Sequence, residues 1–149
     1  MKKENALISA CLLGVKCRYD ASDFYCPATV NLLQKYNLIP FCPELLAKMP
    51  IPRAAVEIVR SRAVTQNGED QTKQFLAGAK KSLMLAKKFK IKKAFLKSGS
   101  PSCGCDLIYD GSFSGKLIAG KGFVAHLFSK NNIRTFSENS IQFKRPGRR

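Results

Sequence analysis

The stretch Ala-Leu-Ile-Ser-Ala-Cys-Leu-Leu-Gly at residues 6–14 decides the fold of this 149-residue chain. Its apolar residues do not alternate with polar ones, so we predict a strand over Ala6–Leu13 that is buried on both faces. Two later runs, Leu38–Cys42 and Ile91–Lys97, have the same character. Helical patterns separate the three runs, which predicts βαβ units with right-handed crossovers. The expected fold class is therefore α/β: a single-domain, three-layer sandwich with a mostly parallel, Rossmann-like sheet.

The segments between and after these strands supply the other expected elements. They are a helix over Pro27–Asn37, one or two short strands within Val56–Thr65, a helix from Asp70 or Thr72 to about Phe89, a short helix around Val124–Phe128 and a strand over Ile133–Ser137. We predict one domain over residues 1–143 and a basic, disordered tail over residues 144–149.

A cysteine lies at the strand-to-loop transition that ends each of the three apolar runs: Cys11, Cys42 and Cys103. In an open α/β sheet, ligand sites form beyond the carboxyl ends of the strands, so these distant thiols could converge on one point. Converging thiolates without a nearby histidine suit a soft metal or an iron–sulfur cluster. Cys17 could be a fourth ligand or a reactive thiol, because Lys16 and Arg18 beside it would lower its pKa.

Other uses of the six cysteines fit the sequence less well. Structural zinc sites usually have paired cysteine knuckles, which this chain lacks, and we interpret Cys26 and Cys105 as incidental. The only histidine, His126, lies in a predicted helix and is interpreted as an ordinary helix position.

Disulfides need an oxidising compartment, but the apolar core Ala6–Ile8 is shorter than the roughly 7–15 residues of a secretory signal. No run approaches the roughly 18 apolar residues of a membrane span, so we expect a cytoplasmic protein.

Polar residues near the candidate ligands could carry chemistry. Glu44, two residues after Cys42, could be a general base or merely a first-turn acid stabilised by a helix dipole. Asp106 is the reserve candidate for the base. Arg53, on a rigid proline loop, could hold a substrate anion. Hydroxyl groups that could bind an anion or a charged intermediate surround Cys103; they belong to Ser98, Ser100 and Ser102.

The charge of the chain is strongly positive. Lys and Arg number 26 against 10 acidic residues, which gives a formal net charge of +16. Such a field attracts phosphates, nucleotides or nucleic acid. The other interpretation is a lysine-rich solvated surface without a specific partner.

Several short motifs occur together and in one order. They are Ser9–Gly14 with Cys17–Asp20, Cys42–Glu44, Pro52–Arg53, Glu57–Val59, Thr65–Thr72, Ser100–Gly104, and Ile108–Gly111 with Phe113–Gly115. Taken together they resemble the thiouracil desulfidase (TudS) family, formerly a domain of unknown function, over nearly all of residues 6–138. The family usually has Gly after the Tyr-Asp pair, where this chain has Ala21.

The resemblance implies a 4Fe–4S cluster with one open iron, held by Cys11, Cys42 and Cys103. It implies a thiolated pyrimidine substrate, such as 2- or 4-thiouracil or its nucleoside or nucleotide, whose sulfur is replaced by oxygen with release of hydrogen sulfide. Glu44 and a serine of the 100–102 loop would assist proton transfer and substrate binding. We therefore expect Glu44 and Ser100 to be catalytic, and Ser102 and Arg53 to bind substrate.

Three alternative functions remain open at this point. A basic nucleic-acid-binding module with structural zinc would fit the charge, although aromatic stacking motifs and zinc knuckles are missing. A redox protein using Cys11 with Cys17 would lack the usual C-x-x-C motif. A third possibility combines two functions: a desulfidase acting on thiolated tRNA, whose basic surface follows the phosphates.

Overall fold

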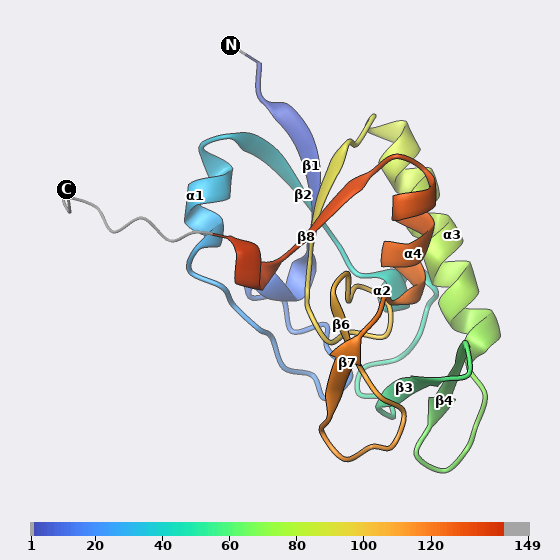
Figure 1. The fold of residues 1–149 in the computed structure, drawn as a ribbon. Helices are drawn as coiled ribbons and strands as arrows, with labels where there is room; N and C mark the ends of the chain where they lie inside the picture. Colours follow the sequence, from blue (N-terminus) through green and yellow to red (C-terminus); the bar gives the residue numbers. More distant parts are fainter. Residues whose placement is uncertain (1, 142–149) are drawn as a thin grey trace.

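Parallel strands form the central sheet in the computed structural model, which describes residues 2–141 (Figure 1). The strands are β1 (Glu4–Ser9), β2 (Tyr36–Phe41), β5 (Lys93–Leu96) and β8 (Arg134–Ser137), in the spatial order β2-β1-β5-β8. Leu7 of β1 is paired with Ile39 on one side and with Ala94 on the other. The proposed tail over residues 144–149 lies outside the described residues.

Helices cover both faces of this sheet, which confirms the predicted three-layer α/β class. Helix α1 (Thr29–Leu33) lies on one face, and α3 (Thr72–Lys88) and α4 (Phe123–Lys130) lie on the other (Figure 1). Side chains alternate along β1, so Ile8 packs on the α1 side and Leu7 on the α3 and α4 side. Burial on both faces explains why β1 is apolar without alternation.

The chain changes direction between β1 and β5. It passes from β1 to β2 on one side, crosses back over β1 to β5, and then continues outward to β8. In open α/β sheets, the carboxyl ends of the two strands at such a switch point border a crevice that commonly binds ligands. The connections at this end therefore position the candidate site.

Two antiparallel hairpins lie at the carboxyl end of the sheet (Figure 1). The first pairs β3 (Val56–Val59) with β4 (Arg62–Thr65), so the ambiguous 56–65 segment forms two strands. The second pairs β6 (Leu107–Tyr109) with β7 (Leu117–Ala119) and was not predicted from the sequence. Its strands are only three residues long, which is too short for a clear alternation pattern.

Two predicted boundaries were wrong. The strand expected over Ala6–Leu13 ends at Ser9, and Ala10–Leu13 forms a 3₁₀ turn (η1) that Gly14 closes at φ 92°. An apolar run shows burial but does not distinguish a strand from a buried turn. The helix expected over Pro27–Asn37 is confined to Thr29–Leu33, because Tyr36 and Asn37 join β2.

The long helix agrees closely with its prediction. It begins at Thr72, whose backbone N–H donates to Asp70 Oδ1 at 2.9 Å, and it ends at Lys88. The short helix α2 (Pro43–Leu46) begins directly after Cys42 and packs against α3. Among residues 2–141, no helix is long and apolar enough to cross a membrane.

Candidate metal and active site

A pocket of about 320 Å³ opens at the carboxyl edge of the sheet. Its lining comes from the ends of β1, β2 and β5 and from both hairpins. Segments far apart in sequence therefore meet here, as the switch-point topology requires.

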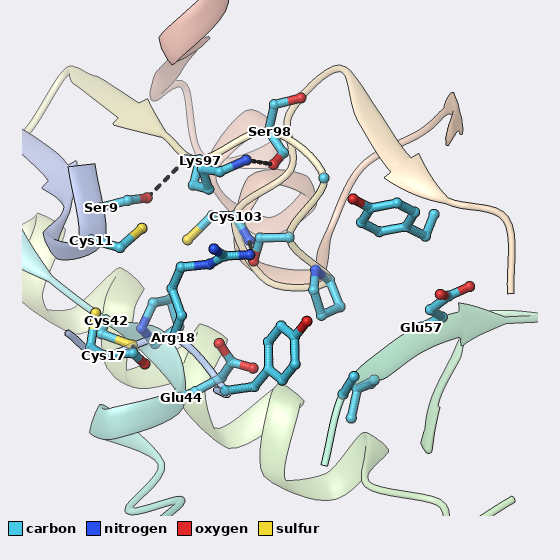
Figure 2. Close-up of a pocket in the computed structure, with 18 of the residues that line it drawn as sticks. Ser9, Cys11, Cys17, Arg18, Cys42, Glu44, Glu57, Lys97, Ser98 and Cys103 are labelled. Carbon is cyan, nitrogen blue, oxygen red and sulfur yellow. Dashed lines mark hydrogen bonds between the residues drawn. The ribbon is translucent and has the colours of Figure 1, made fainter. Parts of the chain in front are cut away.

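Cysteine thiols form one end of this pocket. Cys11, Cys17, Cys42 and Cys103 all line it, and in Figure 2 they gather at one end while Glu57 lies at the other. Cys42 is half-buried and the other three are buried. Cys26 and Cys105 do not line the pocket, and all six cysteines are free of disulfides.

Local structure fixes each candidate ligand. Cys11 lies within the 3₁₀ turn after β1, and Cys42 is the extended residue at the N-terminus of α2. The backbone N–H of Cys103 donates to Ser100 Oγ at 3.0 Å. Directly after Cys103, a Cβ on Gly104 would lie 2.5 Å from the Leu107 carbonyl oxygen, so this tight loop requires glycine.

The surroundings of the thiols favour their protonated form in the absence of a cation. Contact with the Cys17 thiol and burial raise the pKa of Cys42, and burial raises the pKa of Cys103. The pKa of Cys17 was expected to be lowered by Lys16 and Arg18, but this was wrong. Its thiol contacts those of Cys11 and Cys42, and the Cys11 contact is the largest factor that raises its pKa to about 11. Metal binding displaces such protons, so a cationic group would convert these thiols to bound thiolates.

The geometry suits a multi-iron cluster better than a single metal ion. Within residues 2–141, no three His, Cys, Asp or Glu side chains meet closely enough to hold one ion. In an iron–sulfur cluster, the cysteine thiolates bind different iron atoms, so they surround the cluster instead of meeting at a point. The all-sulfur donor set is the one that iron–sulfur clusters use.

Glu44 lines the same pocket from the first turn of α2. Its side chain is 17% exposed, and its Oε2 lies 3.3 Å from Nη2 of Arg53. Burial raises the pKa of Glu44, whereas the positive charge of Arg53 lowers it. Glu44 is therefore both an acid in the first turn of α2 and a residue of the pocket lining.

Ser100 lines the pocket, but Arg53 and Ser102 do not. The Arg53 side chain is 4% exposed, and its Nη2 also donates to the Cys17 carbonyl oxygen at 2.9 Å. Ser102 is fully buried, and its carbonyl accepts from Val124 N–H at the start of α4. Neither of the two predicted substrate-binding residues is among the residues that line the pocket.

Two other residues singled out in the sequence also lie outside the pocket. Asp106 accepts a hydrogen bond from Ser98 Oγ at 3.2 Å, and His126 is exposed on α4. Ser98 itself lines the pocket, as expected for its loop.

Sequence reasoning assigned no role to several other pocket residues. Tyr19, Phe41, Tyr109 and Phe113 give the pocket an aromatic lining. Glu57 reaches it from β3 and accepts hydrogen bonds from the second hairpin. Glu57 and its hydrogen-bond donors lie in the motifs at residues 57–59 and 108–115. The spacing of these motifs in the sequence could not show that they are in contact.

The fold and the site define a class: a doubly wound α/β protein with a cysteine-lined pocket at its switch point. The family model described as 2-thiouracil desulfurase matches residues 6–140, so the chain belongs to this family, as the resemblance predicted.

Two similar proteins illustrate the relationship. Protein YbbK of Bacillus subtilis (strain 168) is 37% identical over 145 residues, which cover 91% of this chain and 96% of YbbK. A solved structure described as a 4Fe–4S-dependent thiouracil desulfidase, TudS, is 38% identical, with a TM-score of 0.87 and coverage of 93% of each chain.

Proposed function

We propose that this protein is a 4Fe–4S-dependent desulfidase of thiolated pyrimidines, with Cys11, Cys42 and Cys103 as the cluster ligands. The observation that carries the proposal is that thiols from three separate strand ends line one end of the pocket that also contains Glu44. Membership of the 2-thiouracil desulfurase family and the likeness to the 4Fe–4S-dependent TudS structure support it.

A cluster bound by three cysteines would supply an iron with an open position that accepts a soft sulfur atom. The overall reaction replaces the thiocarbonyl sulfur by the oxygen of water and releases hydrogen sulfide. We assign Glu44 to remove a proton from the attacking water. Its carboxylate lines the pocket on the side of the thiols, and its ion pair with Arg53 fixes its orientation.

Ser100 is proposed as the hydroxyl donor. Its Oγ accepts hydrogen bonds from the backbone N–H groups of Ser102 and Cys103, which leaves its own proton to donate into the pocket. Arg53 and Ser102 then have indirect roles. Arg53 positions Glu44 and the Cys17 loop, and Ser102 connects the Cys103 loop to α4.

The remaining lining suits a flat heteroaromatic ring. Aromatic side chains offer stacking surfaces, and the volume of about 320 Å³ is that of a small-molecule site. A free base, a nucleoside or a nucleotide is therefore the proposed substrate class. Thiolated RNA is the extension that the net charge of +16 favours.

We place this chemistry in the cytoplasm, because oxidising compartments convert thiols to disulfides.

The direct test is anaerobic reconstitution followed by an assay for sulfide. The protein should become brown, bind about four irons per chain and convert 2- or 4-thiouracil to uracil with one sulfide per uracil. A colourless protein with stoichiometric zinc, or an iron-loaded protein that releases no sulfide from any thiolated pyrimidine, would contradict the proposal.

A further inference from the structure

Part of the pocket wall at the Glu57 end, opposite the thiols, comes from one short segment, Tyr109–Gly115, which we term the outer-wall segment. It connects β6 to β7, and its residues Tyr109, Phe113 and Gly115 line the pocket. The motifs Ile108–Gly111 and Phe113–Gly115 lie here, and sequence reasoning assigned neither of them a function of its own. Contacts with the first hairpin hold this segment at the pocket.

The carboxylate of Glu57 is the main polar contact between this segment and the first hairpin. Glu57 Oε1 accepts hydrogen bonds from the backbone N–H of Gly111 at 2.9 Å and of Phe113 at 3.1 Å. No Lys or Arg side chain within residues 2–141 forms an ion pair with Glu57. Backbone amides therefore satisfy this carboxylate, through charge-assisted hydrogen bonds that are stronger than neutral ones.

The backbone around these amides needs such support. Gly111 has φ +94°, and a Cβ at this position would lie 2.8 Å from Val59 Cγ2 and 2.9 Å from the Ile58 carbonyl oxygen. The segment therefore packs tightly against β3. Phe113 has φ 58°, a left-handed conformation that is unfavourable for a bulky residue and persists only where its surroundings impose it. The bond from its N–H to Glu57 is one such constraint.

We propose that Glu57 is a positioning residue that holds the outer-wall segment against β3 and thereby places Phe113 and Tyr109 around the substrate. The inference deepens the proposed function and rests on it. Glu57 lies at the end of the pocket opposite the thiols, so its role is separate from cluster binding (Figure 2).

The kinetic test compares Glu57→Ala with Glu57→Gln. Alanine removes the acceptor, so KM for thiouracil should rise about tenfold or more while kcat changes little, the pattern of lost binding rather than lost chemistry. Glutamine keeps an acceptor oxygen, so it should retain most of the affinity. Bound iron should equal that of the wild type in both variants. Loss of iron in either variant, or a Glu57→Ala enzyme with normal KM, would overturn the proposal.

Hydrogen exchange tests the anchoring without any activity. In Glu57→Ala, the amides of Gly111 and Phe113 should exchange about tenfold faster or more, because the segment opens locally. Glu69→Gln is the matched control, since Glu69 is an exposed acid at the end of the same hairpin whose side chain makes no hydrogen bond or ion pair within residues 2–141. It should leave both amides and KM unchanged. Unchanged protection in Glu57→Ala would contradict the anchoring even if the wild type proved not to be a desulfidase, which keeps the two failures distinguishable.

Discussion

The four thiols in the pocket do not have equivalent surroundings. Cys11 and Cys42 lie within two residues of the ends of β1 and β2, and Cys103 lies in the loop after β5, where its backbone N–H donates to Ser100 Oγ. Cys17 lies on a longer loop, which Arg53 holds through the Cys17 carbonyl. This difference supports a ligand set of three with Cys17 as a neighbour.

We expect Cys11→Ala, Cys42→Ala and Cys103→Ala each to lose bound iron and sulfide release, because a cluster with three ligands cannot spare one. Iron content and the visible spectrum after anaerobic reconstitution provide the measurement. Cys26→Ala and Cys105→Ala are the matched controls and should keep both, since neither residue lines the pocket.

Cys17→Ala decides whether the ligand set is complete. It should also retain iron, because the proposed cluster has an open position that Cys17 does not fill. Loss of iron on this substitution would make Cys17 a fourth ligand and would argue against an open iron.

Glu44→Gln should keep iron and substrate binding but slow sulfide release about 100- to 10,000-fold, as expected when a positioned general base is lost. Rates and bound iron are measured on the same sample. Arg53→Met is the companion variant, because Arg53 lies against Glu44 without lining the pocket. It should also lower kcat more than it raises KM. Near-normal turnover in Glu44→Gln would show that Glu44 serves only as a first-turn acid of α2.

At the scale of elements, side-chain contacts at the start of α3 connect this helix to the first hairpin, β3–β4. Asp70 Oδ1 accepts from Thr72 N–H at 2.9 Å, and its other carboxylate oxygen pairs with Arg62 of β4. The buried Thr72 hydroxyl in turn accepts from Ala63 N–H at 2.9 Å. These contacts fix the orientation of the hairpin that carries Glu57.

The pH dependence of stability should reveal this junction. Hydrogen bonds from Thr72 and the pairing with Arg62 lower the pKa of Asp70 from 3.8 to about 2. A lowered pKa in the folded state stabilises the protein above the ordinary value and loses that effect as pH falls toward 2. Asp70→Asn should therefore lower Tm at neutral pH, and the difference in Tm from the wild type should shrink below about pH 5. A difference that stays constant down to pH 3 would exclude a role for the charge.

At the scale of the whole molecule, the excess of positive charge over the 149 residues is the dominant property. The pocket itself contains both signs, with Glu44 and Glu57 as well as Arg18 and Lys97 in its lining. Lys97 is already paired with Glu138, at 3.0 Å. The overall field, rather than a single pocket residue, is therefore what should attract an anionic substrate.

Salt dependence separates a functional field from a merely solvated surface. KM for a thiolated uridine monophosphate should rise between about 0.05 M and 0.5 M salt, because screening weakens long-range attraction, while KM for free thiouracil should change little. Steady-state sulfide release gives both values. An equal salt response of the two substrates would mean that the charge plays no part in substrate choice.

The sequence by itself determined the layers of the fold and the most important candidate ligands. Continuous apolar runs are a local signature of strands buried on both faces, and parallel strands force their following residues to one edge of the sheet. The α/β class and the common position of Cys11, Cys42 and Cys103 could therefore be predicted, as could the extent of α3.

Only the tertiary structure decided which side chains face the pocket. Arg53 and Ser102 looked like substrate contacts from their loops, but packing turns Arg53 toward Glu44 and buries Ser102 against α4. The contact of Glu57 with Gly111 and Phe113 joins residues more than fifty positions apart. Local patterns carry no information about such contacts, because the direction of a loop side chain and the meeting of two hairpins depend on the packing of the whole chain.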